Sequence, residues 1–460
     1  MDFPSGAQHF TSLRLERFKN FKDAELKLGP FTVLIGANAS GKSNIRDAFR
    51  FLHGIARGYK LADIIGEKYG EGGERVWSGI RGGTRGIAYA QNSSFALEVK
   101  ILVPVGNGPL PPFNKNHKEV LRQFDYRVKI EFDHDQISPL MACERFQDDK
   151  RDYGVEGTII NNEFQTQLVS SDGVIDEVVA LPRSRPFVYT LAYSLGENLS
   201  VRSELQSTLT NIQSRLHIFI NQISRMRFFD WSLDALRQPS MPGQDVLSDN
   251  GRNLSSVLYA ICQDEQQKRN LLSWIKTLTP MDVVDFEFPA DPIGRVLATL
   301  VERNDQKISL AAASDGTLRF LAFLAALLGP HPSSFYFFEE LENGLHPTRV
   351  GLLLDLIENQ VKDKGIQVVV TTHSPELLGR LSKESLENAS LVYRPPDQSD
   401  AQIIRVIEMP DAERLIRKYK ATELFSSGWF ESTALYMQPD PDDKQFTPKP
   451  SRSRKLRERK

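Results

Sequence analysis

The sequence predicts an α/β fold in which a parallel sheet is joined to an antiparallel β lobe and an α-helical insertion. Strands covered on both faces read as continuous apolar runs, and three such runs occur, FTVLI (31–35), FYFF (335–338) and QVVVTT (367–372). Residues 94–179 hold β-like runs separated by turn-forming residues, which is typical of an antiparallel sheet. Helical apolar spacing over 205–223 and 253–278 predicts the insertion.

Taken in order, the chain begins with two alternating runs, 12–18 and 24–28, which predict a hairpin ahead of the first buried strand. Residues 54–86 are rich in glycine and charge and predict an irregular excursion. Strand character returns at 283–288 and 293–301. The organisation we expect is an N-terminal lobe (1–195), an α-helical insertion (196–284), a C-terminal lobe (285–437) and a basic, disordered tail (438–460).

Composition excludes several classes of protein. The chain has 460 residues, 40% hydrophobic and 25% charged, which is the profile of an ordinary globular protein with room for more than one lobe. A formal net charge of −2 gives no overall basic field for nucleic acid. Cys143 and Cys262 have no metal-type spacing and suit a reducing compartment. The most apolar stretch, 318–328, is too short to span a bilayer, so we expect a soluble cytoplasmic protein without membrane contact.

The loop GANASGKS (36–43) carries the first functional signal. A G-x-x-x-x-G-K-[ST] pattern between a strand and a helical segment (44–56) indicates a phosphate-binding loop, because backbone N–H groups and the helix dipole converge on an anion there. Lys42 would reach the β- and γ-phosphates of a nucleotide, and the Ser43 hydroxyl would bind Mg²⁺. The predicted nucleotide-binding residues in this stretch are Gly36, Asn38, Ser40, Gly41, Lys42, Ser43 and Asn44.

Three further stretches place polar residues at the ends of predicted elements. Ser314, Asp315 and Gly316 precede a helix at 318–328, where they are either an anion site or an ordinary helix cap, and the cap is favoured when the stretch is taken alone. Glu339 and Glu340 end the FYFF run; Glu339 could hold Mg²⁺ and Glu340 could deprotonate the attacking water, the alternative being solvated glutamates. His373, after the third apolar run, could hydrogen-bond the γ-phosphate or the attacking water, the alternative being a structural or surface histidine.

These four stretches, in this order, resemble Walker A, signature, Walker B and His-switch motifs of ATP-binding-cassette-type ATPases of the SMC, Rad50 and RecF group. The stretches SDGTLR (314–319), ENGLHP (342–347) and TTHSPEL (371–377) are similar to the OLD-like "AAA family" ATPases, which include subunits of bacterial anti-phage systems such as Septu and PARIS. The resemblance covers residues 10–57 and 300–380.

The resemblance implies a homodimer or higher oligomer in which ATP is sandwiched between two heads. Lys42 and Ser43 of one chain would share a nucleotide with Ser314 and Gly316 of the other, and residues 346–350 would lie near the same interface. The family usually has Asp where this chain has Glu339, and Gly where it has Ala39. These two departures leave the rate of hydrolysis open, and Ala39 matters most if its φ is positive.

Three functions stay open at this point. The first is an ATPase that senses or regulates, controlling a separate nuclease or effector encoded nearby, since no nuclease motif is found and Asp440 and Asp442 lack a preceding apolar strand. The second is a RecF-like DNA-binding ATPase in repair or recombination, and the third is a scaffold with vestigial activity. The basic residues in 449–460 would contact DNA, RNA or an acidic partner, or simply solubilise the chain.

Overall fold

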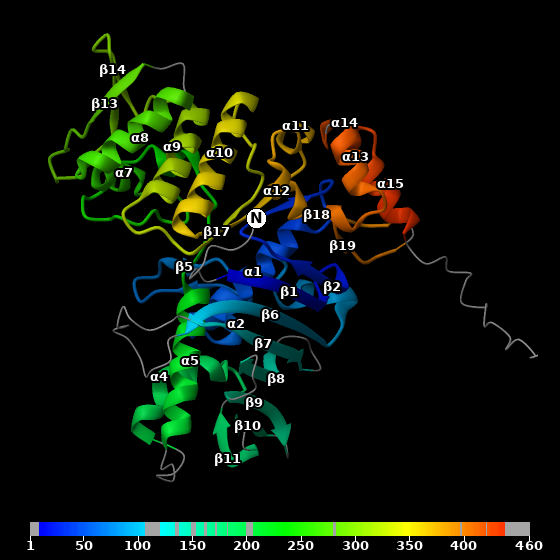
Figure 1. Ribbon diagram of the computed structural model, residues 1–460. Coiled ribbons are helices and arrows are strands. Elements are labelled where there is room, and N and C mark those ends of the chain that lie inside the picture. The colour runs from blue at the N-terminus through cyan, green and yellow to red at the C-terminus, as the bar shows by residue number, and fades with distance from the viewer. Residues whose placement is uncertain are drawn as a thin grey trace, which may run out of the picture.

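The computed structural model describes most of the chain and leaves several loops and both ends outside the description. The described residues are 9–105, 120–133, 138–148, 153–160, 163–170, 173–181, 183–198, 206–278, 282–395, 398–419 and 421–437. The predicted tail, 438–460, therefore lies outside the described residues. In Figure 1 the antiparallel sheet lies at the bottom, one group of helices lies at the upper left, and the C-terminal helices lie at the upper right.

A six-stranded sheet positions the predicted nucleotide loops. Its strands, in spatial order, are β12 (Met226–Phe228), β16 (Phe335–Phe338), β17 (Gln367–Thr372), β3 (Phe31–Ile35), β18 (Ala389–Tyr393) and β19 (Gln402–Arg405). All neighbours are parallel except β18 and β19. The three apolar runs are thus confirmed as adjacent buried parallel strands, and their carboxyl ends meet at one edge.

The second sheet has eight antiparallel strands. In spatial order they are β11 (Gly173–Leu181), β10 (Glu163–Ser170), β9 (Tyr153–Ile160), β8 (Pro139–Asp148), β7 (Val120–Phe132), β6 (Ser94–Val105), β1 (His9–Phe18) and β2 (Phe21–Lys27). The antiparallel lobe predicted over 94–179 is confirmed, and the predicted N-terminal hairpin joins it as its last two strands.

Helix α1 (Lys42–Ala56) packs between the two sheets, and for that reason nearly all of its residues are buried. The Phe49 ring contacts Phe335 and Phe337 of the central sheet at 5.0 and 6.1 Å between centroids, and Phe51 contacts Phe95 of β6 at 5.4 Å. A helix enclosed in this way is held by packing on more than one face. The helix that follows the phosphate loop is therefore a rigid part of the core.

Helices cover the opposite face of the central sheet (Figure 1). They are α6 (Leu233–Leu236), α7 (Leu254–Cys262), α8 (Glu265–Leu278), α9 (Asp315–Leu328) and α10 (Pro347–Lys364). Side chains alternate along β16, so that Phe335 and Phe337 face α1 while Tyr336 and Phe338 join the core beneath these helices. None of the helices in the described part of the chain is long and apolar enough to cross a membrane.

Smaller elements complete the fold. The segment 54–86, expected to be irregular, holds α2 (Leu61–Ile65), β4 (Lys68–Tyr69), β5 (Arg75–Trp77) and the start of α3 (Gly83–Ile87), and η1 (Tyr89–Gln91) follows. Helices α4 (Phe187–Asn198) and α5 (Gln206–Ser224) pack beside the antiparallel sheet. The C-terminal part holds α11 (Pro375–Leu378), α12 (Lys383–Glu387), η3 (Val406–Glu408), α13 (Ala412–Lys418), α14 (Ala421–Ser426) and α15 (Trp429–Tyr436).

Two details differ from the sequence prediction. The expected strand over 293–301 is wrong in its first part, because β14 spans only Thr299–Glu302, between β13 (Val283–Glu287) and β15 (Lys307–Ser309). The strand β12 was not predicted at all, since three residues show no period, yet it pairs with β16. It lies inside the range 196–284, so the chain returns to the central sheet between α5 and α7.

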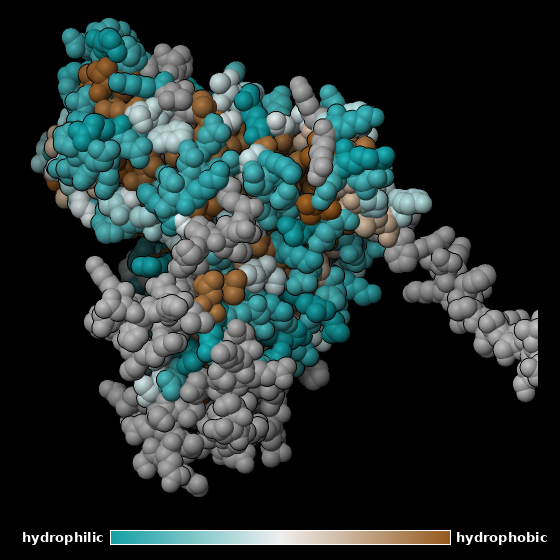
Figure 2. Space-filling view, in the orientation of Figure 1, coloured by the Kyte–Doolittle hydropathy of each residue, from teal (hydrophilic) through white to brown (hydrophobic). Residues whose placement is uncertain are grey.

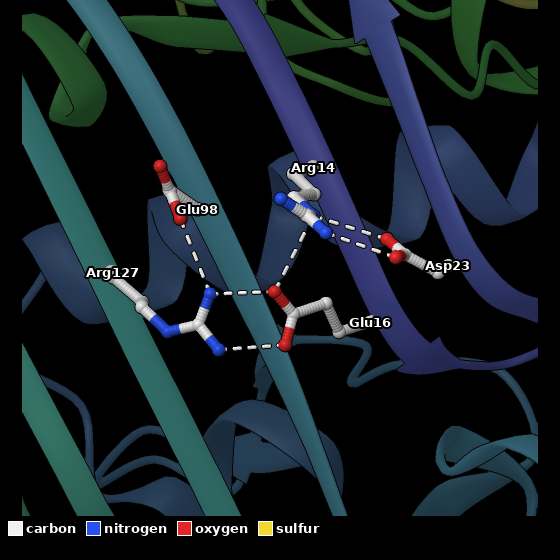
Figure 3. A network of polar contacts seen from close by, with 5 residues as sticks. All are labelled: Arg14, Glu16, Asp23, Glu98 and Arg127. Atoms are coloured by element: carbon white, nitrogen blue, oxygen red, sulfur yellow. Dashed lines mark hydrogen bonds and ion pairs between the residues drawn. The ribbon is translucent and has the colours of Figure 1, made fainter. Parts of the chain in front are cut away.

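An ion-pair network crosses four strands of the antiparallel sheet (Figure 3). Arg127 of β7 donates two 2.6 Å hydrogen bonds to Glu16 of β1 and one of 3.2 Å to Glu98 of β6. Arg14 of β1 donates bonds of 3.0 and 2.9 Å to Asp23 of β2. The hydrogen bond with Glu16 raises the pKa of Arg127, and the same bond lowers the pKa of Glu16. The network links the β1–β2 hairpin to the rest of its sheet.

The surface in the view of Figure 2 is mostly hydrophilic over the described residues, with hydrophobic residues in small separate patches. Scattered apolar residues of this kind are normal on a folded protein.

Glu144 gives the antiparallel lobe a pH-dependent contact. Its fully buried carboxylate accepts hydrogen bonds from the Tyr126 hydroxyl at 2.7 Å and from the Phe187 backbone N–H at 2.6 Å, at the start of α4. Burial raises the pKa of Glu144 to about 7. Folding therefore favours the protonated form, and this group's stabilisation is full below its unfolded pKa of about 4.3 and is lost as pH rises through 7.

We expect Glu144→Gln to remove this pH dependence, because the amide is neutral at every pH and keeps an acceptor oxygen. The wild type loses this stabilisation between pH 5 and pH 8, whereas the variant does not. The difference in free energy of unfolding, variant minus wild type, should therefore rise over this range by on the order of 2–3 kcal/mol. Urea denaturation at both pH values measures the difference, with the exposed Glu25→Gln as the control. A difference that is the same at both pH values would contradict the assignment.

Candidate functional site

The phosphate loop runs from Gly36 to the first turn of α1, directly after β3. Gly41 has φ 122°, and a Cβ there would lie 2.7 Å from the Asn20 side chain, so the position requires glycine. Ala39 has φ 63°, in the left-handed region, which costs an alanine about 1–2 kcal/mol. Ala39 therefore does occupy a positive-φ position, and the loop stores some backbone strain there.

The turn between β1 and β2 contacts this loop and the start of α1. The Asn20 side chain donates to the Ser40 carbonyl at 3.1 Å and accepts from the Asn44 side chain at 2.7 Å. Lys19 forms a buried ion pair of 3.1 Å with Asp47 of α1. Sequence reasoning did not find these contacts, since the partners lie 20 or more residues apart with no local pattern. They hold the carboxyl end of the loop and the start of α1 in one geometry.

The Lys42 side chain folds back over the phosphate loop. Its ammonium donates to the carbonyls of Gly36 at 2.6 Å and Ala37 at 2.8 Å, and the residue is only 7% exposed. Burial lowers the pKa of Lys42, while the charges of Glu340, Glu342 and Glu339, in that order, act in the opposite direction. The predicted phosphate-binding lysine thus lies within the field of three carboxylates from another loop.

These carboxylates belong to the loop 339–342, which follows β16. Glu339 accepts a 2.7 Å bond from the Arg46 guanidinium of α1. Glu340 is exposed and has φ 47°, a strained conformation for a non-glycine residue, and its N–H donates to the Thr371 hydroxyl at 2.9 Å. Strain of this kind is found mainly at functional positions.

Glu342, which sequence reasoning missed, connects this loop to the end of β17. Its Oε1 accepts bonds from the Thr372 hydroxyl at 2.9 Å and from the His373 N–H at 3.0 Å, and the His373 Nδ1 lies 3.4 Å away. Its sequence signals were a third carboxylate two residues after Glu340 and its place at the start of the stretch ENGLHP (342–347). The predicted His373 is therefore held beside the carboxylate loop.

The signature-like stretch forms a separate group. Ser314 caps α9 by accepting from the Thr317 N–H at 3.2 Å, which confirms the cap interpretation, and Asp315 pairs with Arg237 at 2.7 Å. A Cβ at Gly316 would lie 3.1 Å from the Gly344 carbonyl. Across the described residues, no hydrogen bond or ion pair joins residues 314–316 to residues 36–44. One chain thus brings the loops of Lys42, Glu340 and His373 together, whereas Ser314 makes no hydrogen bond or ion pair with the phosphate loop among the described residues.

The oxygen donors at this site fit Mg²⁺, which takes carboxylate, hydroxyl and phosphate oxygens. Glu342 supports the fit because its Oε2 is buried with no hydrogen-bond partner among the described residues. Glu339 is paired with Arg46 and would have to exchange that partner to bind a cation. The described residues contain no cluster of three His, Cys, Asp or Glu able to hold a metal.

Comparison with known proteins identifies the family of the chain. The family model described as "AAA domain, putative AbiEii toxin, Type IV TA system" matches residues 31–102 and 191–379, more than half of the chain. The "ATP/GTP phosphatase" of Helicobacter pylori is 23% identical over 380 residues, 80% of this chain and 86% of that protein. Structural maintenance of chromosomes protein 1 of Arabidopsis thaliana is 44% identical over 69 residues, which are 14% of this chain and 5% of that protein.

Among solved structures, the SMC head bound to the C-winged helix domain of ScpA is similar with a TM-score of 0.44 and 15% identity, over 86% of this chain and 97% of that chain. The matched family segments include the phosphate loop after β3, the carboxylate loop after β16 and His373 after β17. The chain belongs to the family of AAA domains described as putative AbiEii toxins of type IV toxin–antitoxin systems.

Proposed function

We propose that this protein binds and hydrolyses ATP, and that ATP-dependent pairing of two heads controls a separate effector, such as a nuclease, in bacterial anti-phage defence. The observation that carries the proposal is the meeting of Lys42, the carboxylate loop and His373 at the ends of three adjacent parallel strands. Nucleotide chemistry is typically built at this edge of an α/β sheet.

Each residue has a separate role in ATP hydrolysis. The Lys42 ammonium leaves the Gly36 and Ala37 carbonyls and binds the β- and γ-phosphates. Two hydrogen bonds to neutral carbonyl oxygens are thus replaced by contacts with negatively charged phosphate oxygens. Glu340 takes a proton from water as the water oxygen attacks the γ-phosphorus; the bond to the bridging oxygen breaks, and ADP leaves with the electron pair. Ser43 and Glu339 would hold Mg²⁺, which neutralises phosphate charge.

A second head would complete the site. Ser314 and Asp315 are exposed at the N-terminus of α9, and within the described chain they make no hydrogen bond or ion pair with the phosphate loop. A helix N-terminus attracts anions. We place Ser314 and Gly316 of one chain against the nucleotide held by Lys42 of another, in a cytoplasmic homodimer or higher oligomer.

A DNA-binding ATPase of the RecF or SMC kind is the second candidate. The local similarity to a structural maintenance of chromosomes protein favours it. It predicts a DNA affinity that requires ATP and falls steeply with salt. Binding that is the same with and without ATP would exclude this candidate.

A slow or vestigial ATPase is the third candidate. The Glu339–Arg46 ion pair and the strained Ala39 favour it, because both must be accommodated in a nucleotide complex. Tight ATP binding with negligible turnover would support it.

The proposed function is tested by phosphate release measured over a range of protein concentrations, with and without Mg²⁺. If two heads form the site, the activity per chain should rise with protein concentration and then level off, because association precedes turnover. Activity per chain that is constant over the whole range, with the protein monomeric by sedimentation in ATP, would contradict the paired-head site.

A further inference from the structure

We propose that Glu342 is a positioning residue that fixes the His373 loop against the carboxylate loop, so that turnover, more than nucleotide binding, depends on it. This inference rests on the proposed ATP hydrolysis and deepens it. Glu342 would not react with the substrate in this role. It would act through His373 and the backbone around it.

The three acidic residues of the loop differ in their partners. Glu339 is paired with Arg46 at 2.7 Å, and Glu340 is exposed, its carboxylate accepting among the described residues a single hydrogen bond, of 3.4 Å from the Asn343 amide. Glu342 is the carboxylate turned toward β17, with a side chain only 13% exposed. These partners leave the Glu340 carboxylate accessible to a water molecule, whereas the Glu342 carboxylate is hydrogen-bonded to the loop that contains His373.

Glu342 organises three consecutive residues. Its Oε1 accepts from the Thr372 hydroxyl at 2.9 Å and from the His373 N–H at 3.0 Å. The Thr372 oxygen in turn accepts from the Ser374 N–H at 3.0 Å. One carboxylate oxygen thus supports two successive backbone amides, and hydrogen bonds linked in this way strengthen one another.

The imidazole ring is held from the same side. His373 Nδ1 lies 3.4 Å from Glu342 Oε1, and the ring is 45% exposed. A carboxylate beside Nδ1 orients the ring and leaves Nε2 as the nitrogen available to a nucleotide. The buried Oε2, without a partner among the described residues, offers a second acceptor within this polar group.

The test compares Glu342→Ala and Glu342→Gln with the wild-type full chain. In the alanine variant, kcat for ATP should fall on the order of 10- to 100-fold, because a displaced His373 loses its alignment. The Kd for ATP should change by less than about threefold, since Lys42 and its loop are untouched. Glutamine keeps an acceptor oxygen for Thr372 and His373, so it should recover kcat to within about fivefold of wild type.

A double-mutant cycle separates positioning from general damage. In a His373→Ala background, Glu342→Ala should lower kcat by less than about twofold more, because the residue through which it acts is already gone. The matched control is Glu358→Ala, which removes a carboxylate of α10 that accepts from the Ser385 hydroxyl at 2.5 Å, and which should leave kcat unchanged. Equal fold losses in the wild-type and His373→Ala backgrounds would overturn the proposal.

A measurement that does not depend on turnover distinguishes this proposal from the proposed function. Amide hydrogen exchange in residues 371–378, without nucleotide, should be faster in Glu342→Ala than in wild type and near wild type in Glu342→Gln. Unchanged exchange in Glu342→Ala overturns the positioning role even if ATP is hydrolysed. A wild-type chain that hydrolyses no ATP refutes the proposed function, whatever the exchange shows.

Discussion

Lys42→Ala is expected to abolish nucleotide binding. The ammonium lies buried among the Gly36 and Ala37 carbonyls and within the field of three carboxylates, so it is already directed to the inside of the phosphate loop. Loss of two charge-assisted contacts, each worth roughly 1.5–3 kcal/mol, weakens ATP binding by about 100-fold or more. Equilibrium binding of a fluorescent ATP analogue measures the effect.

Lys129→Ala is the matched control, since Lys129 is an exposed lysine of β7. It should bind the analogue as wild type does. If Lys42→Ala bound ATP within about threefold of wild type, the loop would not be the nucleotide site.

Glu340→Gln is expected to stop hydrolysis while leaving ATP bound. The strained backbone at φ 47° and the bond from its N–H to Thr371 fix the direction in which the side chain leaves the loop. An amide keeps the shape but cannot accept a proton, and a general base contributes about 100- to 10,000-fold. Phosphate release should fall by that factor, and a stable ATP-bound dimer should appear in sedimentation velocity.

Glu376→Gln changes an exposed carboxylate of α11 and should leave both readouts at the wild-type level. Hydrolysis by Glu340→Gln at the wild-type rate would remove Glu340 from its catalytic role.

The parts of the fold that sequence could predict are those with a strong local pattern. Three apolar runs became β3, β16 and β17 because a parallel strand buried on both faces needs no polar alternation. The antiparallel lobe followed from alternation and turns. The strand β12 was missed because three residues carry no period, and it exists only through its pairing with β16.

The candidate site was predictable where a motif is contiguous and unpredictable where contacts are long-range. Gly36 to Ser43 is one uninterrupted pattern, so its strand–loop–helix context could be predicted. The partnerships of Glu339 with Arg46, Asn20 with Ser40 and Glu342 with His373 join residues from different elements. No spacing in the chain encodes them. The Glu339 and Glu342 partnerships leave Glu340 as the carboxylate to which the proposed function assigns the water.

Mixing two inactive variants tests the central claim, a site shared between two heads, most directly. Lys42→Ala removes the phosphate loop's lysine, and Ser314→Arg blocks the N-terminus of α9. Neither should hydrolyse ATP alone. In an equal mixture, random pairing makes about half of the dimers mixed. Each mixed dimer has one site of its two with both Lys42 and Ser314 intact, so about one quarter of wild-type activity should return. A mixture no more active than its separate components would contradict the shared site.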